Sequence, residues 1–95
     1  MLHTLTMSPF RCDVPAIRRL IAVGDHVLLL EDGVIFALAG TKTLSILINS
    51  SAYIYALRVD LLARGLMSRV SSQVEIISYT DFVMLVLENP QQVSW

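Results

Sequence analysis

The sequence has little charge and almost no cysteine. Among its 95 residues, 16% are charged and 55% are hydrophobic, and the single cysteine is Cys12. One cysteine excludes an internal disulfide and is ordinary in a reducing compartment. The low charge and high hydrophobicity exclude an intrinsically disordered tail. The net charge is −1 and no basic run is present, so direct binding to nucleic acid, which depends on neutralising phosphates, is not expected.

Long apolar segments are also missing. The longest uncharged stretch, residues 43–57, is fifteen residues long, whereas a membrane-spanning helix needs about 20. No basic segment followed by a long apolar one precedes Pro9, so we expect no secretory signal peptide, no membrane association and a cytoplasmic location.

The apolar content nevertheless exceeds what a small core can hide. The mean hydropathy is +0.65, and the length fits one domain over residues 1–95. A domain of this size buries only about 60–65% of the surface of its unfolded chain. The excess predicts a protein partner, and we expect that the chain alone is not a well-behaved monomer.

Short apolar runs alternate with helix-like segments along the chain. The expected strands are residues 2–6, 26–30, 52–57 and 74–78, with helical segments between them and after the last. Because no hairpin turn separates two strands, the alternation predicts a three-layer α/β sandwich with a mainly parallel sheet of about four strands. The tail, residues 91–95, is expected to be irregular.

The last predicted helix is apolar in every direction. It is expected to begin at a cap, Thr80 or Asp81, and to end before Pro90. At 100° per residue its apolar run divides into two faces. One face is Phe82, Leu85 and Val86, and the other is Val83, Met84 and Leu87. A sheet can bury only one of them, and the sequence leaves open which; the other is a candidate subunit interface.

No motif for a cofactor or a metal is visible. The four glycines are isolated and form no nucleotide-binding loop, so no cofactor is expected. His3, His26 and Cys12 form no CxxC or HxxxH pair, although the two histidines are expected near one edge of neighbouring strands. Each histidine is better interpreted as structural or exposed than as a metal ligand. Glu31 and Asp32 are expected to form a turn that caps the next segment.

Cys12 is the one candidate nucleophile. It lies after the first predicted strand and just before a helix, where open α/β sheets place their ligands. The helix N-terminus and the neighbouring Arg11 would lower its pKa and favour the thiolate. Cys12 is therefore either a persulfide or redox cysteine or an inert residue in a loop. The second interpretation is favoured, because no histidine is placed as its base.

Four blocks cover nearly the whole chain in order: MLHTLxxSPF, GDHVLLLEDGV, YALRVDLLARGL and SYTDFVMLVLENPQQVSW. Together they resemble the TusB-type proteins of the DsrH branch of the DsrE/F/H family. The resemblance implies a DsrE/F/H-like fold and a place in a TusBCD-like sulfur-relay complex. That complex is a dimer of heterotrimers, a heterohexamer, in which TusC-like and TusD-like subunits are the partners.

In the family, the complex passes persulfide sulfur from a TusA-like to a TusE-like carrier, toward 2-thiouridine at the tRNA wobble position. Because the family's sulfur-accepting cysteine belongs to the TusD-type subunit, the resemblance implies a non-catalytic subunit here. Some DsrH chains of sulfur oxidisers carry a cysteine in the first helix, where Ile17–Leu20 has none. Three alternatives stay open: a small sulfurtransferase using Cys12, a DsrH-type sulfur-oxidation protein, and a dimerising α/β protein without sulfur chemistry.

Overall fold

Five parallel strands form one sheet in the computed structural model, which describes residues 1–95. They are β1 (Leu2–Leu5), β2 (His26–Leu29), β3 (Tyr53–Leu57), β4 (Glu75–Ile77) and β5 (Gln92–Ser94). Their order across the sheet is β4-β3-β2-β1-β5, and all four pairings are parallel. The predicted α/β class with a parallel sheet is confirmed, with five strands in place of about four.

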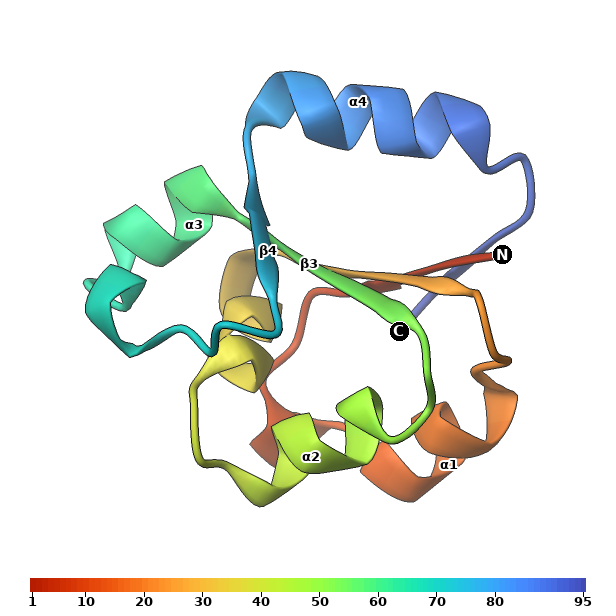
Figure 1. The fold of residues 1–95 in the computed structure, drawn as a ribbon, viewed down its shortest axis with the longest axis horizontal. Coiled ribbons are helices and arrows are strands. Elements are labelled where there is room, and N and C mark those ends of the chain that lie inside the picture. The colour runs from red at the N-terminus through yellow and green to blue at the C-terminus, as the bar shows by residue number, and fades with distance from the viewer.

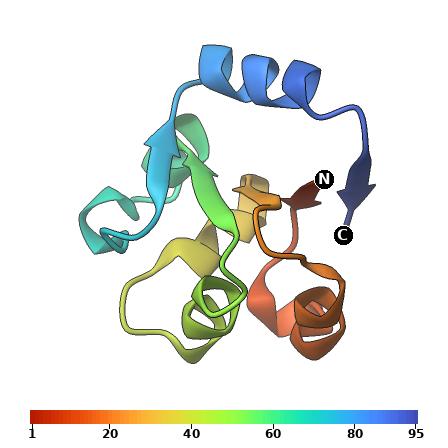
Figure 2. The same cartoon turned by 45° about the vertical axis from the view of Figure 1, so that its right-hand side comes forward.

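The fifth strand shows that the prediction for the tail was wrong. Residues 92–94 pair with residues 2–4 of β1, and Trp95 N–H donates a hydrogen bond to the carbonyl of Thr4. Figure 2 shows β5 beside the first strand at one edge of the sheet. A three-residue strand with one apolar side chain, Val93, is too short to show a periodic pattern in the sequence.

Four α-helices and three 3-10 helices connect the strands. They are η1 (Pro9–Arg11), α1 (Val14–Leu20), η2 (Glu31–Ala37), α2 (Lys42–Ile48), α3 (Arg58–Ala63), η3 (Met67–Arg69) and α4 (Tyr79–Glu88). No helix has the length and hydrophobicity to cross a bilayer. The cap of α4 is Ser78, not Thr80 or Asp81 as expected. Ser78 and Asp81 form a reciprocal capping box, in which each side chain accepts a hydrogen bond from the other residue's N–H.

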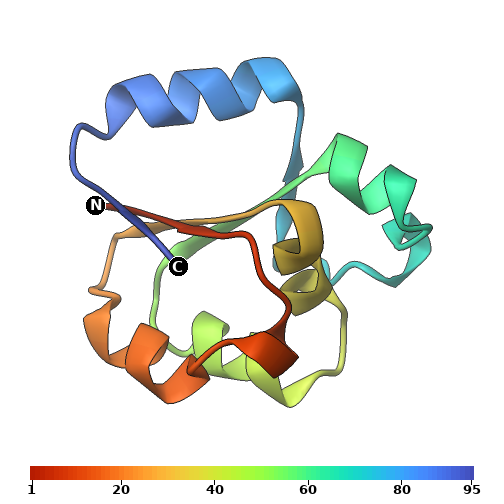
Figure 3. The same ribbon diagram turned by 180° about the vertical axis from the view of Figure 1, so that it is seen from behind.

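The handedness of the connections decides which face of the sheet each helix covers. The strands β1 to β4 follow one another across the sheet, so right-handed crossovers keep their connections on one face. The chain must then return from β4, at one edge, to β5, at the other. A right-handed crossover in this reverse direction places α4 on the opposite face. Figures 1 and 3 show α1 and α2 on one side of the sheet and α4 on the other, with α3 beyond the end of β3.

The hydrophobic core is therefore unequal on the two faces. Fifteen buried residues cluster on the side of α1 and α2. Only four cluster on the side of α4: Leu2, Leu28, Ile77 and Leu85. A five-stranded sheet is about 19 Å wide between its outer strands, and one helix is about 10 Å across. Part of the α4 face of the sheet consequently stays uncovered.

The carboxyl ends of the strands are held by η2. A Cβ on Gly33 would lie 1.8 Å from the carbonyl oxygen of Leu5, so only glycine allows η2 to approach the end of β1. Glu31 N–H donates to the Asp60 carboxylate at 2.6 Å, and Asp32 pairs with Arg64 at 3.0 Å. Glu31 and Asp32 thus form the first turn of η2, and they tie it to α3 in place of the expected side-chain cap.

A polar network joins both ends of the chain at β1. The buried His3 accepts a hydrogen bond from the Trp95 indole N–H at its Nδ1 (3.4 Å), which leaves its Nε2–H to donate to Asp25 at 2.9 Å. Asp25 also accepts from Ala22 N–H and from the ammonium group of Met1. Burial alone would raise the pKa of Asp25, but these hydrogen bonds and the N-terminal charge lower it to about 2.

We expect Asp25→Asn to lower the stability of the fold at neutral pH by about 1–2 kcal/mol, because it removes charge-assisted hydrogen bonds. A carboxylate with a depressed pKa stabilises the fold above its unfolded pKa, near 4, and loses that effect as the pH falls toward 2. The unfolding midpoints of the wild type and the variant should therefore converge between pH 4 and 2. Urea unfolding followed by circular dichroism measures this. Asp13→Asn is the control, since asparagine is an equally good helix cap; a constant gap down to pH 2 would contradict the prediction.

Candidate functional site

The inner face of α4 holds the helix to the sheet. Leu85 is only 8% exposed and joins the small buried cluster. Phe82 and Val86 pack against the same cluster, at the helical spacing of one face. The face of Phe82, Leu85 and Val86 is therefore the one that packs on the sheet. The sequence alone had left open which of the two helix faces does so.

The outer face of α4 is apolar and exposed. Val83, Met84 and Leu87 are 39%, 51% and 73% exposed, and we call these three residues the outer stripe. Nothing in the chain covers them, because α4 forms the edge of the molecule and no other element lies over its outer side (Figure 1). An apolar stripe of this kind is typical of a protein interface, so the outer stripe is the candidate interaction site.

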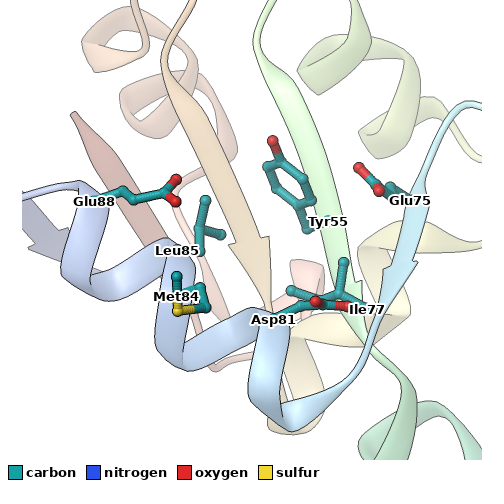
Figure 4. Close-up of a pocket in the computed structure, with 7 residues that line it drawn as sticks. All are labelled: Tyr55, Glu75, Ile77, Asp81, Met84, Leu85 and Glu88. Atoms are coloured by element: carbon teal, nitrogen blue, oxygen red, sulfur yellow. The ribbon is translucent and has the colours of Figure 1, made fainter.

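A groove of about 290 Å³ runs beside α4, between the helix and strands β3 and β4. Apolar side chains of Ile77, Met84 and Leu85 line part of it, and three carboxylates also line it: Glu75, Asp81 and Glu88. Figure 4 shows Tyr55 between the carboxylates of Glu75 and Glu88. Burial and the nearby charges, first that of Glu75, raise the pKa of Tyr55. The groove thus places the phenol of Tyr55 beside carboxylates that form no ion pair within the chain.

His26 lies on the same face of the sheet as this groove. Its Nδ1 is 3.1 Å from the hydroxyl of Tyr55, and its ring stacks on Tyr53 at a centroid distance of 5.3 Å. His3 points to the other face, because side chains alternate along paired strands and His26 stands opposite Leu2. The two histidines are thus on neighbouring strands but do not share a site.

Cys12 lies between η1 and α1, beyond the carboxyl end of β1 and on the far side of the sheet from α4. Its half-buried thiol points to the carbonyl of Met7, with Sγ and O 3.6 Å apart. Burial raises the pKa of Cys12, so the expected lowering by the helix N-terminus and Arg11 was wrong in direction. The Asp13 carboxylate already accepts a hydrogen bond from Ala16 N–H at this N-terminus. The site therefore holds a thiol and offers it no base.

The comparisons with known proteins agree with this architecture. The model of the family described as DsrH like protein matches residues 7–92. The chain belongs to the DsrH-like family. Full-length relatives of this DsrH-like chain are TusB proteins, 53% identical in Erwinia tasmaniensis, 47% in Serratia proteamaculans and 45% in Yersinia pestis. Each alignment spans 95 residues and the whole of both chains.

Two solved structures share the fold of this DsrH-like chain. The ychN protein of E. coli superposes with a TM-score of 0.74, covering 99% of this chain and 97% of that one, at 14% sequence identity. Protein Tm0979 of Thermotoga maritima superposes with a TM-score of 0.64 over 96% and 97% of the two chains, at 24% identity. At these identities the likeness establishes the fold alone.

The two faces of α4 should respond differently to charge. Leu85→Asp should unfold the DsrH-like domain, because an unpaired buried charge costs about 3–5 kcal/mol. Leu87→Asp should keep the native fold, because residue 87 is exposed. Far-ultraviolet circular dichroism and thermal unfolding of both variants measure the difference. Equal loss of structure in the two variants would mean that α4 does not present two distinct faces.

Proposed function

We propose that this DsrH-like chain is a non-catalytic subunit of a cytoplasmic, TusBCD-like sulfur-relay complex. Its role is to complete an assembly in which a cysteine of another subunit carries the persulfide. The sulfur passes onward toward 2-thiouridine at the wobble position of tRNA. The chain's partners in this proposal are TusC-like and TusD-like subunits, with TusA-like and TusE-like carriers acting through the complex.

The observation that carries the proposal is the exposed outer stripe on a chain with full-length similarity to TusB proteins. A homologous α/β subunit can offer a matching apolar helix face, and helix-on-helix contact would remove Val83, Met84 and Leu87 from water. Transfer of apolar surface out of water stabilises such a contact by about 25 cal/mol per Å². The stripe thus supports a role in assembly.

The environment of Cys12 favours a chain that helps to assemble the complex over a chain that carries sulfur itself. A sulfur carrier needs an accessible thiolate, whereas this thiol is half-buried, has a raised pKa and faces a backbone carbonyl. The thiol and the outer stripe also lie on opposite sides of the sheet. A partner docked on α4 would therefore leave the surroundings of Cys12 unchanged.

Leu87→Asp should abolish co-purification with co-expressed TusC-like and TusD-like subunits, because docking would desolvate the new charge. Leu62→Asp is the matched control: Leu62 is 60% exposed, but on α3, so this variant should assemble normally. Tandem-affinity purification and size-exclusion chromatography measure the outcome. Normal assembly of Leu87→Asp, with its fold verified, would exclude the outer stripe as the interface.

Cys12→Ser should leave the 2-thiouridine content of tRNA unchanged, because no step is assigned to this thiol. Mass spectrometry of nucleosides from cells carrying only the variant measures this. Mass spectrometry of the wild-type chain after exposure to a persulfide donor is the companion measurement. Loss of thiolation with the complex still assembled, or a sulfur atom added to Cys12, would favour the sulfurtransferase alternative.

A further inference from the structure

We infer that the uncovered part of the α4 face of the sheet is a second docking surface, which binds an arginine-bearing segment of a partner protein. We call it the open sheet surface. Its residues are His26, Tyr53, Tyr55 and Glu75 from the strands and Met84 and Glu88 from α4. The open sheet surface adjoins the outer stripe and shares only Met84 with it, and the inference does not depend on sulfur chemistry.

The open sheet surface is concave and aromatic. The groove beside α4 adjoins a second hollow of about 370 Å³ at strands β3 and β4, and the two share Tyr55 and Glu75. Tyr53 is 60% exposed, while its neighbour Ile54, which faces α1 and α2, is 5% exposed. One side of β3 is therefore core and the other is a tyrosine surface. Tyrosine and methionine are enriched where protein interfaces are most buried.

The carboxylates of this surface form no ion pair within the chain. The four ion pairs of the molecule use the carboxylates of Asp25, Asp32 and Asp60, and none uses Glu75, Asp81 or Glu88. Of the seven lysines and arginines, Arg11, Arg18, Arg19 and Lys42 belong to η1, α1 and α2, on the opposite face of the sheet. The other three, Arg58, Arg64 and Arg69, belong to the connection between β3 and β4, and none of them forms an ion pair with Glu75, Asp81 or Glu88. The surface thus repels phosphate and acidic segments and attracts a cation.

Arginine fits this combination better than lysine does. Its planar guanidinium stacks on a tyrosine ring and donates two parallel hydrogen bonds to one carboxylate. In Figure 4, Tyr55 presents its ring between Glu75 and Glu88, above the apolar side chains of Met84 and Leu85. A guanidinium placed there would stack on the tyrosine ring and pair with a carboxylate at the same time. An apolar side chain next to that arginine would occupy the groove. A lysine ammonium would supply only the charge.

A second copy of this chain is the weaker occupant. Its arginines lie outside the open sheet surface: Arg11, Arg18 and Arg19 on η1 and α1, and Arg58, Arg64 and Arg69 in the connection between β3 and β4. A contact through any of them joins two different surfaces, so each added copy leaves both surfaces free at the ends and the contact does not close into a dimer. We therefore assign the surface to an arginine-bearing segment of another protein.

Peptide titration of the full-length chain, followed by ¹⁵N nuclear magnetic resonance, tests the assignment. The probes are the capped peptide Leu-Arg-Leu-Arg and its lysine and glutamate counterparts. The arginine peptide should shift the amide signals of β3, β4 and the second half of α4. The lysine peptide should bind several-fold more weakly, the glutamate peptide should not bind, and added salt should weaken binding. Equal binding of the arginine and lysine peptides, or shifts confined to other elements, would overturn the assignment.

Two variants locate the binding. Glu75→Gln combined with Glu88→Gln keeps both side-chain shapes and should weaken arginine-peptide binding at least tenfold, and Tyr53→Leu should weaken it independently. Glu31→Gln is the matched control, because Glu31 is exposed at the opposite end of the strands; it should bind as the wild type does. Unchanged affinity in the double variant would refute the inference. So would self-association of the wild type that the double variant abolishes, because the occupant would then be a second copy.

The same titration separates this inference from the proposed function. Leu87→Asp should bind the arginine peptide normally even where it fails to assemble with homologous subunits. If those subunits dock only on the outer stripe, the glutamine double variant should assemble with them normally but bind the arginine peptide weakly. A negative result for one of the two surfaces therefore does not decide the proposal for the other.

Discussion

The right-handed return of the chain from β4 to β5 is the constraint on which the rest of the structure depends. Four strands laid in one direction place all their connections on one face of the sheet, and the fifth strand is reached only by crossing the opposite face. One helix of ten residues makes that crossing. A single helix cannot cover a five-stranded sheet, so the second face remains partly open, and this follows from topology before any side chain is considered.

The composition of α4 agrees with this constraint. Its apolar run must hold the helix to the sheet through Leu85 and its neighbours, and the same run leaves Val83, Met84 and Leu87 facing outward. The ends of the helix are satisfied locally. The capping box of Ser78 and Asp81 closes the start, and the Asn89 side chain donates to the Leu85 carbonyl at the end. The helix is therefore well formed, and what it lacks is a partner on its outer side.

The fifth strand is attached through the chain's own termini. Trp95 donates a hydrogen bond to His3, His3 donates one to Asp25, and Asp25 accepts one from the ammonium group of Met1. Because this network supplies partners to a histidine that is fully buried, removing one member would leave polar groups unpaired in the core. It also fixes the point where α4 ends its crossing. The polar network and the apolar helix thus act on opposite faces of the same edge of the sheet.

The sequence by itself determined the properties that depend on neighbouring residues. Apolar runs of strand length, separated by helical segments without hairpin turns, were enough for the parallel α/β class, and helical spacing was enough to divide residues 82–87 into two faces. The tertiary structure alone decided the fifth strand, which of the two faces meets the sheet, the separation of His3 from His26, and the raised pKa of Cys12. Strand pairing joins opposite ends of the chain. The helix face that meets the sheet depends on how α4 packs against side chains from three strands and not on its own sequence. Desolvation depends on every element around a group. A local sequence pattern contains none of these features, because each arises only when distant segments of the chain come into contact.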